Sequence, residues 1–135
     1  MRDGSGLRDQ KTTERAPPID AVIRLPNVIS TRDDLEAWLG VPLHRFESSR
    51  HGAGHYGQLN TAVEGGWPAL VALLERVGPA LQDCVNRGVV GRPEIDVGWM
   101  MGGGSVASSL RVPQAVTAAI ARYGFELVVS VYRAD

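Results

Sequence analysis

Three histidines within a short stretch of the chain are the first residues whose types and spacing suggest chemistry. His51 and His55 are four residues apart, a spacing that on a helix would place two metal ligands on one face. The glycines between them disfavour a helix, however, and no HExxH motif supplies a general base. A metal site would need two further ligands, for which His44 and Glu47 are the candidates. We therefore expect a solvated loop and no bound metal, with a metal site as the alternative.

A glycine run and a single cysteine are weaker candidates. The run from Gly102 to Ser105 is not followed by the lysine of a Walker phosphate loop, and its spacing does not fit a dinucleotide fingerprint. It predicts a turn between strands, with a backbone anion site as the alternative. Cys84 lies between Leu81 and Val85 on an apolar stripe, which is typical of a small buried side chain. The chain also lacks a GxSxG motif. We predict no catalytic residue and no cofactor.

Composition and charge limit the classes of partner. The chain has 135 residues, 44% of them hydrophobic and 21% charged, which is enough for one globular domain. Its formal net charge of −1 lacks the basic excess that phosphate neutralisation requires. The apolar runs are much shorter than the ~20 residues of a membrane span, and the N-terminus has no apolar signal segment. We expect a cytoplasmic protein that binds neither nucleic acid nor membrane.

These residues must be positioned by a domain that follows a polar tail. Residues 1–18 have mixed charge, no periodic apolar face and a proline-rich end, so they predict a flexible tail, with a partner-binding arm as the alternative. Residues 19–135 form the single predicted domain. Its first strand covers 21–25 and ends at Pro26, which cannot donate a hydrogen bond to a neighbouring strand.

Capping residues and apolar spacing predict three helices. The first begins at Ser30 or Thr31 and ends at Gly40. The second and longest has Pro68 at its first position, and we expect Pro79 to kink or split it. The third runs from Pro113 to Gly124. The predicted buried stripes are Leu35, Trp38 and Leu39 in the first helix, Leu70, Leu73, Leu74, Val77, Leu81, Cys84 and Val85 in the second, and Val116, Ile120 and Tyr123 in the third.

Alternating apolar residues predict the remaining strands. Residues 43–48 and 56–63 are interpreted as two strands joined by a glycine-containing hairpin loop. Residues 94–101 and 125–132 alternate as two further strands, and 106–110 predict a short returning strand. The resulting fold class is α+β, a mainly antiparallel sheet of about four to six strands with three helices packed on one face.

The other face of this sheet has no predicted helix to cover it. Antiparallel sheets tolerate one solvated face, so this surface is predicted to be either solvated or a contact site for a partner. The residues that we assign to it are Arg24, Asp96, Met100, Glu126, Ser130 and Tyr132.

The order of motifs resembles that of the bacterial DUF4279 family. The resemblance rests on LExWLG after the first strand, a leucine-rich helix with an internal proline, a GGG turn, VPQAVTAAIARYGFEL and a terminal VxVY. It covers residues 20–133 and is poorest over 41–67. It implies a small bacterial α+β domain of the size of many immunity or accessory proteins, and it transfers no catalytic residue.

Three functions are compatible with these patterns. The favoured one is a non-enzymatic binding protein, such as an immunity protein that neutralises a cognate toxin by contact through the polar sheet face or the 48–57 loop. The second is a metal-dependent enzyme built around His44, His51 and His55. The third is a structural module in which the open sheet face forms a two-fold homodimer.

Overall fold

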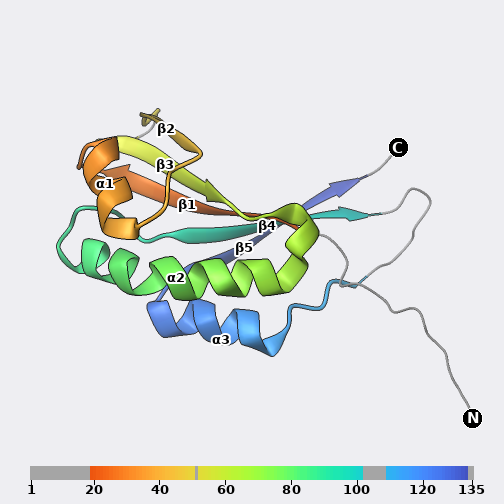
Figure 1. Cartoon of the computed structure of the whole chain (residues 1–135). Helices are drawn as coiled ribbons and strands as arrows, with labels where there is room; N and C mark the ends of the chain where they lie inside the picture. The colour runs from red at the N-terminus through yellow and green to blue at the C-terminus, as the bar shows by residue number, and fades with distance from the viewer. Residues whose placement is uncertain (1–18, 51, 102–108, 134–135) are drawn as a thin grey trace, which may run out of the picture.

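Five strands and three α-helices make up the part of the chain that the computed structural model describes, residues 19–50, 52–101 and 109–133 (Figure 1). The predicted tail at 1–18, the glycine turn at 102–105 and His51 lie outside the described residues. The elements in chain order are β1 (Asp20–Val28), α1 (Arg32–Leu39), β2 (Arg45–Ser48), β3 (His55–Asn60), a 3₁₀ turn η1 (Val63–Gly65), α2 (Gly66–Asn86), β4 (Glu94–Met101), α3 (Gln114–Tyr123) and β5 (Glu126–Arg133).

The strands form one sheet in the order β2-β3-β1-β4-β5. Three neighbouring pairs are antiparallel, whereas β4 and β5 are parallel. Two consecutive parallel strands need a crossover connection. Helix α3 lies between β4 and β5 in the chain and provides this crossover. The predicted α+β class, the number of strands and the three helices are confirmed. No strand is formed at residues 109–110, and the rest of the predicted 106–110 strand is outside the described residues.

The hydrophobic core lies between the helices and one face of the sheet. Figure 1 shows α2 and α3 side by side along that face, and the two helices contact each other. Odd-numbered residues of β1 and β4 point into the core, because successive side chains of a strand alternate between faces. The core side chains that are fully buried are Ile23, Leu25, Val28, Leu35, Leu59, Leu70, Leu74, Val77, Leu81, Ile95, Val97 and Val116.

Helix α1 begins and ends where the sequence predicts. Thr31 is the N-cap, and its side-chain oxygen accepts a hydrogen bond from the backbone N–H of Asp34 at 3.1 Å. Gly40 ends the helix with φ 74°, a left-handed conformation that favours glycine. The prediction that Trp38 is buried is wrong. Its side chain is 40% exposed, and the guanidinium of Arg87 lies 4.9 Å from the ring centroid.

The prediction that β1 ends at Pro26 is also wrong, because the strand continues to Val28. The register with β3 shifts between Leu25 and Val28, so Pro26 and Asn27 together face one residue of β3, as in a β-bulge. A bulge removes the residue that lacks an N–H from the regular ladder. The carbonyl of Pro26 accepts a hydrogen bond from Gly91 at 2.8 Å, and Asn27 adopts φ 51°.

Of the two predicted effects of Pro79, a kink or a split, the split is wrong, because helix α2 is continuous through this residue. The neighbouring Gly78 has a packing role. A Cβ atom at this position would lie 2.5 Å from the ring of Tyr123, so the glycine allows α3 to approach α2 closely. Pro68 is the third residue of the helix and not the first, but it is still in the first turn, where amides lack intrahelical acceptors. No helix in the described ranges is long and apolar enough to span a membrane.

Candidate functional site

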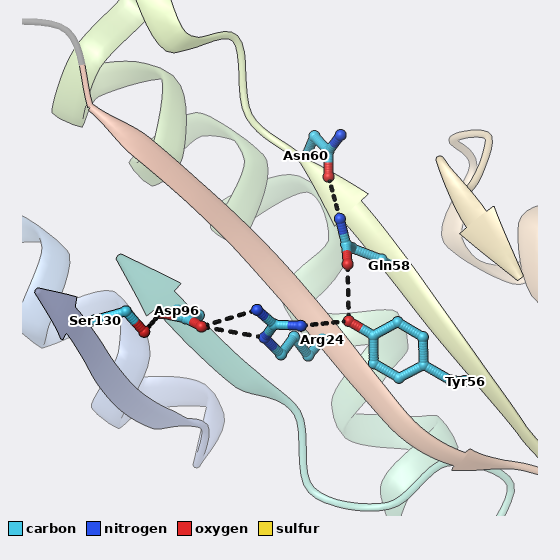
Figure 2. Close-up of polar contacts among 6 residues, drawn as sticks. All are labelled: Arg24, Tyr56, Gln58, Asn60, Asp96 and Ser130. Atoms are coloured by element: carbon cyan, nitrogen blue, oxygen red, sulfur yellow. Dashed lines mark hydrogen bonds and ion pairs between the residues drawn. The ribbon is translucent and has the colours of Figure 1, made fainter. Parts of the chain in front are cut away.

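The sheet face opposite the helices carries a connected set of polar side chains from four neighbouring strands. Figure 2 shows the six residues, which we call the open-face network. Arg24 on β1 lies at its centre, between β3 on one side and β4 and β5 on the other. The members of the network are Asn60, Gln58, Tyr56, Arg24, Asp96 and Ser130.

Arg24 connects the two halves of the network. Its Nε and Nη2 donate to Oδ2 of Asp96 at 3.2 and 2.9 Å, and its Nη1 donates to the hydroxyl of Tyr56 at 2.8 Å. The Arg24 side chain is 37% exposed and that of Asp96 only 12%. Partial burial opposes the charge of Arg24, but the bonds to Asp96 and Tyr56 outweigh it and raise the pKa of the guanidinium. The bonds to Asp96 and Tyr56 thus favour the charged form of Arg24 and maintain the ion pair.

Strand β3 extends the network away from Arg24. The Tyr56 hydroxyl donates to Oε1 of Gln58 at 2.8 Å, and Nε2 of Gln58 donates to Oδ1 of Asn60 at 2.8 Å. Gln58 is only 8% exposed, and these bonds satisfy part of its buried amide. The sequence patterns did not predict that Tyr56, Gln58 and Asn60 lie on the open face. Their alternation with Gly57 and Leu59 is the signal that could have identified them.

Strand β5 completes the network on the other side. The Ser130 hydroxyl donates to Oδ1 of Asp96 at 2.7 Å, so both carboxylate oxygens of Asp96 accept hydrogen bonds. Arg24, Asp96 and Ser130 were all predicted to lie on this face, and the structure brings them into direct contact. Because each contact is to a charged group, these hydrogen bonds are of the stronger kind. The network is suited to holding its side chains in position.

Two exposed apolar side chains lie beside this network. Met100 and Tyr132 are partners in the β4–β5 register and are 60% and 50% exposed. The Tyr132 ring lies over Gly98, where an added Cβ atom would come within 3.2 Å of it. The glycine thus leaves room for the ring to lie across the sheet. Glu126, the last residue predicted for this face, is not part of the cluster. It lies six residues from Tyr132, or roughly 20 Å along the strand, opposite Glu94 and 3.9 Å from Arg92.

A polar hollow of about 390 Å³ adjoins the network at the β2 side of the sheet. The guanidinium of Arg45 lies 5.4 Å from the centroid of the Tyr56 ring, so Tyr56 contacts one arginine with its hydroxyl and another with its face. Arg45 also forms an ion pair with Glu47. The hollow, which we call the arginine hollow, is lined by Arg24, Arg45, Glu47, Ser48, Ser49, Arg50 and Tyr56.

The described histidines are separated by the length of β3. Nδ1 of His44 accepts a hydrogen bond from the backbone N–H of Asn60 at 3.0 Å, at one end of the strand. His55 begins the strand and stacks on Phe46 with a centroid distance of 4.7 Å. Their positions are thus roughly 16 Å apart along the sheet, too far to share one ion. Within the described residues, no three His, Cys, Asp or Glu side chains are grouped as metal ligands.

Cys84 has the environment that the sequence predicts. It is 1% exposed in the core, and burial raises the pKa of its thiol, an effect that nearby Arg87 only partly offsets. The thiol is on the helix side of the sheet and takes no part in the open face.

The geometry therefore presents a preorganised polar network, an apolar pair and a positively charged hollow on one face of the sheet. No protein-family model, curated protein or solved structure matches the chain, so the resemblance to the DUF4279 family stays a prediction.

Proposed function

We propose that the chain is a protein-binding module that recognises its partner through the open sheet face. The observation that carries this proposal is the position of Met100 and Tyr132, two large exposed side chains that lie next to the open-face network. Aromatic and methionine side chains are enriched at the centres of protein interfaces, where a few residues supply most of the binding energy. A rigid polar surface around them reduces the entropy that is lost on binding.

The hydrogen bonds of the network support binding more than proton transfer. Both oxygens of Asp96 already accept hydrogen bonds, and the Tyr56 hydroxyl accepts one bond and donates another. Such a network fixes polar groups at defined positions, which favours one partner surface over others by electrostatic complementarity.

The charges on this face indicate the chemistry of the partner. Three arginines and one glutamate line the arginine hollow. Arg24 is paired with Asp96 and Arg45 with Glu47, but the charges of these groups and Arg50 together still have a positive balance. Arginine presents a planar set of donors that suits carboxylates. We therefore propose a partner that places an acidic side chain in the arginine hollow and an apolar side chain against Met100 and Tyr132.

Photo-crosslinking in the native cell tests this surface directly. A photoreactive amino acid at Met100 should capture a specific protein, whereas the same group at Gln82, an exposed position on α2, should not. Capture of the same set of proteins from both positions, or of nothing from Met100, would contradict the proposal.

Affinity measurements then test the residues. With the captured partner purified, Tyr132→Ala should weaken binding by about 2 kcal/mol or more, roughly 30-fold. Trp38→Ala is the matched control, because Trp38 is an exposed aromatic residue on a helix and not on the open face. Equal losses in both variants would show that general destabilisation, and not the face, is responsible.

Neutralisation of a cognate toxin is the specific form of binding that we propose. Co-expression with the product of the neighbouring gene tests it. If that product is a toxin, the wild-type chain should restore growth and Met100→Lys should not, while thermal unfolding of the variant stays unchanged. If the wild type and Met100→Lys both restored growth, toxin neutralisation would not depend on the open face.

A further inference from the structure

Strand β5 forms one edge of the sheet, and the stretch between its two charged end residues lacks the proline and charged side chains that usually protect an edge. It has eight residues, and no described strand pairs with its outer side. Long exposed edges are normally interrupted by proline, by bulges or by charged side chains, because their free backbone groups pair with other strands. The segment from Leu127 to Tyr132 contains neither proline nor a charged residue, so this edge is open to pairing.

The orientation of the β5 backbone identifies the groups that are available. Glu126 donates its N–H to the carbonyl of Pro93 at 3.1 Å, on the β4 side. Successive residues of a strand direct their N–H and C=O groups to opposite edges. The backbone groups of Leu127, Val129 and Val131 therefore point outward, away from β4.

The same three residues also have exposed apolar side chains. Leu127, Val129 and Val131 are register partners of Ile95, Val97 and Trp99, so their side chains lie on the helix face of the sheet. There they remain 37%, 40% and 55% exposed, because the helices leave this edge partly uncovered. Free backbone groups and uncovered apolar side chains thus coincide on alternate residues of one strand.

We infer that β5 pairs with β5 of a second copy, antiparallel and about a two-fold axis at Val129. In this register Val129 faces its own counterpart and Leu127 faces Val131 of the other copy. It is the register that sets all three exposed side chains against one another. Each facing pair exchanges two backbone hydrogen bonds, about six in total. The two sheets become one continuous sheet with all helices on the same side.

Several features of the chain favour a second copy as the partner of the β5 edge. A two-fold interface must be self-complementary, and the spacing of Leu127, Val129 and Val131 about Val129 meets this requirement. The absence of charge between Leu127 and Tyr132 avoids repulsion of like charges across the axis. This seam differs from the open face, which the sequence predicts as an alternative homodimer interface, and the inference does not depend on the proposed function.

The mass in solution tests the pairing. Light scattering across the micromolar range should give twice the mass of one chain for the wild type and a single-chain mass for Val129→Pro. Proline removes an outward N–H and leaves the bonds to β4 intact, and it is tolerated on the free side of an edge strand. Val131→Lys, which adds a charge to the same edge, should also give the single-chain mass. A wild-type chain that stays monomeric throughout this range would overturn the inference.

Met100→Lys is the control that separates this seam from the open face. It changes the proposed recognition surface and should leave the dimer unchanged. A dimer that Met100→Lys dissociates, and that Val129→Pro does not, would place the seam on the open face and overturn the inference. Circular dichroism of each variant confirms that a change of mass is not caused by unfolding.

Cysteine substitution tests the register. Facing residues of a hydrogen-bonded antiparallel pair have Cα atoms about 5.5 Å apart, within the range of a disulfide. Mild oxidation should therefore link two copies of Val129→Cys. Leu127→Cys should remain unlinked, because its counterpart lies four residues away along the strand, roughly 13 Å. Linking of Leu127→Cys and not of Val129→Cys would contradict the proposed axis. The buried thiol of Cys84 is common to both variants.

Discussion

At the scale of single residues, Arg24 is the point where the open face is most sensitive to change. Its side chain spans from β4 to β3, and its loss would leave the carboxylate of Asp96, only 12% exposed, without its cation. An ion pair on the surface contributes little to stability, whereas an uncompensated charge in a half-buried place costs free energy.

We therefore predict that Arg24→Met lowers the free energy of unfolding by about 1–3 kcal/mol. Arg45→Met is the matched control: it breaks the ion pair with Glu47, in which both side chains are 51% exposed, and should cost less than about 1 kcal/mol. Urea unfolding measures both. A double-mutant cycle with Asp96→Asn should show that much of the Arg24→Met loss disappears when the carboxylate is absent. Equal losses for the two arginines would contradict this view of the network.

Glu36 is a second single residue of interest, because it makes a pH-dependent contribution to the stability of the fold. Its Oε2 accepts a hydrogen bond from the backbone N–H of Leu43 at 2.7 Å, and this bond, with help from Arg32, lowers the pKa of Glu36 below its ordinary value of 4.5. A carboxyl group with a lowered pKa in the folded state stabilises the fold above its unfolded pKa. That contribution is lost as the pH falls through the folded pKa.

The melting temperature of the wild type should accordingly fall as the pH decreases below 4.5, and Glu36→Gln should reduce this fall. Glu36→Gln keeps an oxygen that can accept the bond from Leu43 but removes the titrating group. Asp33→Asn serves as the comparison in the first turn of the same helix. An unchanged pH profile in Glu36→Gln would show that Glu36 does not contribute.

At the scale of elements, local signals in the sequence located the helices well. Helix α1 begins after Thr31 and ends at Gly40, and α3 ends at Gly124, as predicted. Capping and left-handed turns depend on only a few neighbouring residues. Val116 and Ile120 of α3 are buried as its apolar spacing predicts, whereas Tyr123, which was also predicted to be buried, is only half-buried.

The predictions that failed concern features that tertiary contacts determine. Pro26 predicts the end of β1, but a bulge accommodates it in the sheet. Trp38 falls on the apolar stripe of α1, yet the core is already filled by Leu35 and Leu39, and Arg87 covers part of the ring. The order of the strands is set by which edges meet in space, which a single sequence does not encode in a local pattern. For this reason, the contact of Tyr56 on β3 with Arg24 on β1 could not be predicted.

The contact of Gly78 with Tyr123 gives a prediction about how α2 and α3 pack. Gly78→Ala should destabilise the fold, by about 1–2 kcal/mol after the better helix propensity of alanine is included. The added Cβ atom displaces the Tyr123 ring and its hydrogen bond to Glu75 at 2.7 Å. In a Tyr123→Ala background, the same Gly78→Ala change should stabilise the helix. Thermal unfolding of the four proteins measures this reversal of sign, and destabilisation in both backgrounds would rule out the ring as the cause.

At the scale of the whole molecule, β1 is the strand on which the rest of the sheet is assembled. It pairs with β3 on one side and with β4 on the other, and its core side chains Ile23 and Leu25 are 0% exposed. Strand β2, by contrast, is a four-residue edge strand whose side chains are mostly exposed. The two strands should differ strongly in local stability.

Amide hydrogen exchange measures that difference. We expect the amides of β1 that are bonded to β3 or β4 to exchange only through global unfolding, and those of β2 to exchange first. If the inferred dimer forms, the outward amides of Leu127, Val129 and Val131 should be protected in the wild type and should exchange rapidly in Val131→Lys. Protection of β2 equal to that of β1 would contradict this ranking.

The mixed sheet also determines how the molecule responds to mechanical load. Asp20, Gly98 and Ser130 lie in one row across three strands, so the start of β1 and the end of β5 are at the same end of the sheet. A force between these two points would peel β5 from β4 one hydrogen bond at a time and would not shear all of them together. Strand β5 is thus the element that a protein-unfolding motor would remove most easily. Its removal would break the hydrogen bond from Ser130 to Asp96 before the core is disturbed.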